Sequence, residues 1–262
     1  MMALTDHIWY FFIYSIIGYL CEILYCSIGT RRFVNRGFLH GPYIPVYGFG
    51  GLSTALLLSS AASNAVIVFI GAMVIASVIE YITGYLLERL FRIRLWDYRG
   101  RKLHVRGRIC LLNSILFGLL SLLVVYVIHP FLQETVSNFP ERLRSSGASV
   151  MLLTLGVDTT ASILSMAAFT DRLQRIKRLR AMLESRMDLL SQGRQRLVDA
   201  LDAEVARVIQ QVRRSGSRII DAFPGIGSEE LDMPLKVIRD MIEKRRKRRR
   251  STDRHDDVRS DQ

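Results

Sequence analysis

The sequence lacks the short motifs that identify common enzyme classes. It holds no GxxxxGKS or GxxxxGKT loop, no HExxH and no GxSxG pattern. Without a phosphate-binding loop, the chain cannot by itself be a P-loop ATPase. Its 3 cysteines include no CxxC pair and lie within or beside apolar stretches, which favours packing over a disulfide framework or a zinc site. We therefore expect neither an enzyme, nor a metal site, nor a cofactor.

Motifs for reading or stacking on bases are also absent, although the formal net charge is +12. This absence disfavours nucleic acid as a partner. The basic residues gather in loops beside apolar stretches and in the C-terminal tail, a pattern typical of proteins that contact anionic lipid. Seven consecutive basic residues of the tail are predicted to bind lipid headgroups: Lys244, Arg245, Arg246, Lys247, Arg248, Arg249 and Arg250.

Long apolar runs, in contrast, make up most of the first 170 residues. Five stretches approach the roughly 20 apolar residues that a helical membrane span needs. They cover about 7–28, 44–62, 65–87, 109–131 and 149–169. The sequence therefore predicts an all-α, polytopic membrane bundle of about five spans. The second stretch is short and begins with Pro42 and Pro45, so a re-entrant segment is the alternative there, and it would change the side of the N-terminus.

The charges of the connecting loops predict the orientation. The loop after the third stretch is rich in arginine and lysine, which marks a cytoplasmic loop. Its basic residues are Arg89, Arg92, Arg94, Arg99, Arg101, Lys102, Arg106 and Arg108. Five spans then place the N-terminus outside and the C-terminus in the cytoplasm, in a multi-pass protein of the inner membrane.

Three acids fall inside apolar stretches, where a charge is costly unless it faces a cavity or a partner. Glu22 and Glu80 are expected at matching depth, about 20 Å from the outer surface at about 1.5 Å per residue. Asp158 is expected nearer the middle of the fifth span. We interpret all three as candidates for a substrate or ion pathway, and the alternative is that each bonds to polar partners in a sealed bundle.

Residues 35–50 add a second candidate for the pathway. This stretch, NRGFLHGPYIPVYGFG, contains two prolines and four glycines. They preclude a continuous helix, and irregular backbone persists at membrane depth only where protein or a water-filled cavity surrounds it. Broken segments of this kind form binding sites in transporters. We therefore include His40, Gly41 and Pro42 in the candidate pathway.

Several of these motifs occur together in one family. NRGFLHGPYIPVYGFG, followed by EYITGYLLERLF, RLWDY and GRICL, resembles the type IV ABC-transporter permease family known as CmpB, a bacterial group, over roughly residues 7–130. The resemblance implies a permease subunit that works with a separate ATPase. In that interpretation Trp96, Asp97 and Tyr98, with Arg108 in the same loop, brace a cytoplasmic gate or dock the partner.

The C-terminal third predicts a different kind of structure. After a transmembrane domain over residues 1–170, apolar residues repeat every seven positions through residues 171–222, as in a coiled coil. Residues 223–262 are expected to form a short helix and a basic, partly disordered tail. The repeat supports a homo-oligomer, and with it a second hypothesis: a membrane-anchored scaffold or sensor that signals through its coiled coil. The acids and histidines alone leave an intramembrane enzyme as a third hypothesis.

Overall fold

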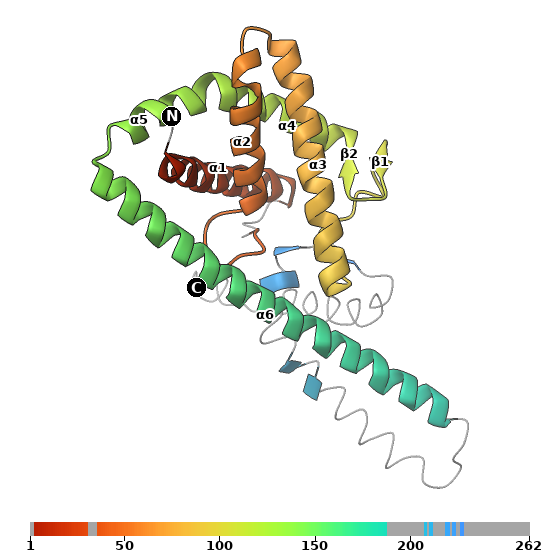
Figure 1. The fold of residues 1–262 in the computed structure, drawn as a ribbon. Helices are drawn as coiled ribbons and strands as arrows, with labels where there is room; N and C mark the ends of the chain where they lie inside the picture. Colours follow the sequence, from red (N-terminus) through yellow and green to blue (C-terminus); the bar gives the residue numbers. More distant parts are fainter. Residues whose placement is uncertain are drawn as a thin grey trace, which may run out of the picture.

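The computed structural model describes residues 3–30, 36–187, 207–208, 210–211, 218–220, 222–223 and 226–227. Almost all of this part is helical (Figure 1), so the predicted all-α class is confirmed. The elements in order are α1 (Leu4–Thr30), α2 (Pro45–Leu58), η1 (Ser59–Ala61), α3 (Ala65–Phe91), β1 (His104–Val105), β2 (Ile109–Cys110), α4 (Leu111–Leu123), η2 (Val124–Ile128), α5 (His129–Ser137) and α6 (Glu141–Met187).

Four segments of the described chain are long and apolar enough to cross a membrane. They are Leu4–Ile28, Ala65–Phe91, Leu111–Ser137 and Glu141–Leu179. The second predicted span is not among them. Its helix, α2, has 14 residues and is therefore about 21 Å long, shorter than the roughly 30 Å hydrocarbon core. Pro45 lies in the first turn of α2 and Ile44 before it is extended, as proline requires of its predecessor, so the helix cannot begin earlier.

The short helix α2 crosses α1 and packs against it (Figure 1). The amide of Ile44 donates to the carbonyl oxygen of Ser15 at 3.0 Å. Further along, Gly51 lies against Tyr14. After η1 the chain turns, and α3 runs back beside α2 as a helical hairpin (Figure 1). The irregular residues 36–44 and α2 therefore both pack against α1.

The remaining helices enclose this hairpin from the other side. Helix α4 continues through the π-helical turn η2 into α5, and α6 then runs past the ends of α1 and α3 (Figure 1). Polar contacts also join these helices to α1. The Tyr14 hydroxyl lies 2.7 Å from Nδ1 of the buried His129 at the start of α5.

A large apolar cluster joins the end of α3 to α6 and to the described C-terminal residues. Its buried members are Phe91, Ile93, Leu95, Met166, Phe169, Leu173, Ile176, Val208, Ile219, Ile220, Ala222, Phe223 and Ile226. Arg94 and Gly227 are also joined by a backbone bridge. Helix α6 runs unbroken across residue 170, the predicted end of the transmembrane domain. Most of the predicted coiled coil, and all of Lys244–Arg250, lie outside the described residues.

Alanine at two glycines of α2 separates helix packing from helix propensity. A Cβ at Gly48 would overlap Ser15 Oγ and lie 2.7 Å from the carbonyl oxygen of Phe11, whereas a Cβ at Gly50 meets nothing within 4 Å. We expect Gly48→Ala to lower the free energy of unfolding by about 1–3 kcal/mol, and Gly50→Ala not to lower it. Equilibrium unfolding in mixed micelles measures both. Equal effects would contradict the close approach of α1 and α2.

Candidate functional site

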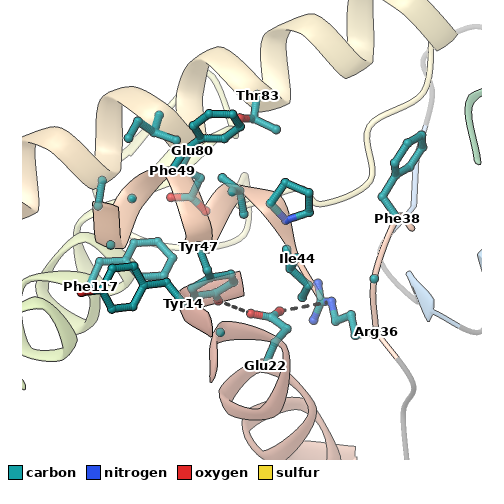
Figure 2. Close-up of a pocket in the computed structure, with 18 of the residues that line it drawn as sticks. Tyr14, Glu22, Arg36, Phe38, Ile44, Tyr47, Phe49, Glu80, Thr83 and Phe117 are labelled. Atoms are coloured by element: carbon teal, nitrogen blue, oxygen red, sulfur yellow. Dashed lines mark hydrogen bonds and ion pairs between the residues drawn. The ribbon is translucent and has the colours of Figure 1, made fainter. Parts of the chain in front are cut away.

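A cavity of about 400 Å³ lies where α1, α2, α3 and α4 meet the irregular segment and the loop after α3 (Figure 2). Most of its wall is apolar or aromatic. Its lining includes two acids and one arginine: Glu22 from α1, Glu80 from α3, and Arg36 from the start of the irregular segment. Two of the predicted pathway residues, Glu22 and Glu80, therefore share one cavity.

The carboxylate of Glu22 is fully partnered. Arg36 Nε lies 3.2 Å from Glu22 Oε1, and the Tyr47 hydroxyl donates to Oε2, as the dashed lines in Figure 2 show. Arg36 also donates from Nη1 to the sulfur of the buried Cys26 at 2.6 Å. Residues from α1, the irregular segment and α2 thus meet at one ion pair, and the negative charge of Glu22 is compensated.

The carboxylate of Glu80 is only half partnered. Glu80 is 7% exposed. Tyr98 donates its hydroxyl to Glu80 Oε1 at 3.0 Å, and Asn113 in turn donates to that hydroxyl oxygen at 2.6 Å. Burial and the nearby Glu80 raise the pKa of Tyr98, so the phenol stays protonated and remains a donor. Glu80 Oε2 has no hydrogen-bond partner within the described residues.

Asp158 lies outside the cavity lining and binds the irregular segment from α6. Its Oδ1 accepts the amide of His40 at 2.8 Å, and its Oδ2 accepts the amide of Gly41 at 2.7 Å and the Tyr43 hydroxyl at 2.8 Å. These bonds satisfy backbone donors that have no helix to bond within. The geometry of Asp158 is that of a structural clamp.

His40, Gly41 and Pro42 likewise lie beside α6 and do not line the cavity. His40 Nδ1 is 3.0 Å from Asp158 Oδ1 and 2.8 Å from Ser162 Oγ. A Cβ at Gly41 would overlap the ring of Tyr43. Their pathway role remains a prediction, and their observed contacts hold the segment in place.

The loop after α3 is tied to the bundle by ion pairs and backbone contacts. Trp96 Nε1 donates to the carbonyl oxygen of Arg108 at 3.0 Å. The guanidinium of Arg108 reaches Glu88 Oε2 at 2.7 Å, while Arg94 pairs with the other oxygen of Glu88 at 2.6 Å. Burial lowers the pKa of Arg108, but the hydrogen bond and the charge of Glu88, with Tyr81, together outweigh burial, so the pKa is raised.

Trp96 and Tyr98 line the cavity, whereas Asp97 and Arg108 do not. Asp97 pairs with Arg99 of its own loop at 2.8 Å. Burial raises the pKa of Asp97, but the hydrogen bonds and the charge of Arg99 together outweigh burial, so the pKa is lowered. The four predicted loop residues thus divide into two that face the cavity and two that hold the loop.

Sequence reasoning missed three polar members of the site: Arg36, Tyr47 and Asn113. Arg36 and Tyr47 both lie in the irregular stretch 35–50, of which only His40, Gly41 and Pro42 were predicted to belong to the site. A signal for Arg36 does exist, because a basic residue close to a buried acid in an otherwise apolar region is a candidate ion pair. Asn113 carries no comparable signal.

Removing the charge of Asp158 tests the clamp. We expect Asp158→Asn to lower the free energy of unfolding by about 2–4 kcal/mol, because an amide group replaces one of the two acceptor oxygens, so that either the amide of His40 or the donors of Gly41 and Tyr43 lose their acceptor. The control is Asp171→Asn, at an exposed acid of the same helix, which should change it by less than about 0.5 kcal/mol. Thermal unfolding of both in detergent measures the difference, and equal stabilities would contradict the clamp.

Comparison with known proteins gives one match. Residues 9–163 match a family model described as a putative ABC-transporter of type IV. No curated protein and no solved structure matches the chain. The matched region contains every cavity residue except Phe223, so the site lies in the part of the chain that the family shares.

Proposed function

The chain belongs to the family of putative type IV ABC transporters, and from this premise we propose that it is the permease-like subunit of a transporter in the inner membrane. Its four long apolar helices agree with a membrane protein. Because the sequence has no phosphate-binding loop, the proposal requires ATP hydrolysis by a separate subunit. The substrate passes through the cavity between Glu22 and Glu80.

The observation that carries this proposal is a cavity built around a broken segment. A sealed bundle would pack the interior to the density of an organic crystal. Here instead, about 400 Å³ stays open beside two acids, in the volume range of ligand sites. The cavity lies where the irregular segment precedes the short helix α2, and transporters use broken helices of this kind for binding sites.

The proposal predicts an ATPase partner. Purification of the full-length chain from native membranes into lipid nanodiscs, at native expression, should yield a particle that contains a P-loop ATPase in a fixed ratio. Double substitution of Trp96 and Asp97 by alanine should reduce the amount of ATPase recovered, if this loop docks it. A particle that contains only copies of this chain would contradict the permease proposal.

The proposed orientation places the turn before α3 outside and the arginine-rich loop in the cytoplasm. Ser63 and Gly100 are exposed residues of these two connections, and a Cβ at Gly100 meets nothing within 4 Å. In a chain whose native cysteines are replaced by serine, an impermeant maleimide should label Ser63→Cys in intact spheroplasts. It should label Gly100→Cys only after the membrane is opened. The reverse pattern would contradict the orientation.

A second function is favoured by the contacts of the C-terminal residues. Phe223 lines the cavity, and its ring lies 5.9 Å from the Arg36 guanidinium carbon. Arg218 donates to the carbonyl oxygens of Leu39 and Phe38 at 2.9 and 3.3 Å. A ligand in the cavity would therefore contact the segment that leads to the basic tail. In this alternative the protein is a sensor, with its tail bound to anionic lipid or self-associated through the predicted coiled coil.

A charge placed at Ile226 should detach the described C-terminal residues from the apolar cluster. Trp96 packs against the cluster that contains the buried Ile226, and it is one of 2 tryptophans, so Trp9→Phe leaves it as a single reporter. We expect Ile226→Asp to shift the emission of Trp96 to the red, because solvent replaces the apolar contacts. Leu103→Asp, at a position that is 73% exposed, should cause no shift. An unchanged spectrum for Ile226→Asp would contradict the coupling.

A further inference from the structure

We propose that the cavity binds an organic cation with a bulky apolar body, and that the positive charge of this ligand lies against Glu80. The inference rests on the proposed function, in that it takes the cavity as a ligand site, and it adds the chemical class of the ligand. Three properties of the cavity carry it: its charge balance, a buried oxygen without a partner, and the nature of its walls.

The charge balance leaves one acid of the cavity, Glu80, without a basic partner among the described residues. Glu22 and Arg36 neutralise each other as an ion pair. Within the described residues, no ion pair joins Glu80 to a basic side chain, and Glu80 Oε2 accepts no hydrogen bond. A buried carboxylate in this condition is costly unless a cation or a donor reaches it. A bound cation would supply that partner, and a bound anion would be repelled.

Glu80 lines the cavity, and its unpartnered oxygen is buried in the cavity wall. Figure 2 shows Glu80 and Glu22 reaching into the same cavity from two helices, with the ring of Tyr47 between the irregular segment and α4. Tyr98 already occupies the other oxygen of Glu80, so the carboxylate is held in one orientation. A ligand that turns the buried Oε2 toward the cavity does not have to break a hydrogen bond of this oxygen.

The walls favour an organic cation over a metal ion. Aromatic rings from several elements line the cavity, among them Phe11, Tyr47, Phe49, Trp96 and Phe117. Aromatic faces attract organic cations such as quaternary ammonium groups. A small inorganic cation instead needs several oxygens to replace its hydration shell, and the mostly apolar walls do not supply them. The volume of about 400 Å³ suits a drug-sized molecule.

Tetraphenylphosphonium is a suitable probe, because it is a permanent cation with an apolar body. Its binding to the full-length protein in phosphatidylcholine nanodiscs is measured by equilibrium dialysis, with empty nanodiscs as background. We expect one saturable site per chain. Glu80→Gln should raise the Kd about tenfold or more, because the opposing charge is lost. Glu134→Gln removes an exposed acid of α5 and should leave the Kd unchanged.

Tetraphenylborate, measured separately, has the same shape and the opposite charge, and it should show no saturable site. This comparison needs only the wild-type chain, so it holds even if Glu80→Gln fails to fold. The inference is overturned if tetraphenylphosphonium does not saturate, if tetraphenylborate binds as well, or if a folded Glu80→Gln binds like the wild type. The ATPase content of the same preparation is scored separately. If the cation binds but no ATPase is recovered, only the permease proposal is contradicted. If an ATPase is recovered but the cation does not bind, only the proposed class of ligand is contradicted.

Discussion

The structure depends on one polar contact, the carboxylate of Asp158 on the irregular segment. Backbone that is not helical can persist at membrane depth only if its donors and acceptors find partners in the protein. Asp158 accepts the amides of His40 and Gly41 and the hydroxyl of Tyr43. Arg218 donates to carbonyl oxygens of the same segment. These contacts hold the extended segment in place.

The irregular segment in turn forms part of the cavity wall. Helix α2 begins only at Pro45, and Arg36 and Tyr47, from opposite ends of the irregular segment, both reach Glu22 at the cavity. Glu80 faces the same space with one oxygen unpartnered. The contact of Phe223 with the cavity links this site to the C-terminal residues, so transport and sensing would use the same pocket.

The sequence was sufficient to predict the features that depend on the length and hydropathy of its apolar stretches. Four of the five predicted spans are long apolar helices, and Glu22 and Glu80, placed at matching depth by residue counting, share a cavity. The second span was overestimated at its C-terminal end, because the apolar run continues to residue 62, whereas α2 ends at Leu58 and a 3₁₀ turn follows. Asp158 was interpreted as a pathway residue because its partners lie 115–118 positions away in the chain, and no local pattern reports such a contact. No local sequence pattern reports the hydrogen bond of Tyr98 to Glu80, or that of Asn113 to Tyr98, either.

The central claim is that Asp158 holds a broken segment open beside the two acids. An electron cryomicroscopy structure of the full-length chain in lipid nanodiscs tests it most directly. The account predicts a non-helical backbone over residues 36–44, with the Asp158 carboxylate within hydrogen-bond distance of the amides of His40 and Gly41, and an open cavity between Glu22 and Glu80. A continuous helix through residues 36–58, with Asp158 turned away from it and no cavity, would contradict the account.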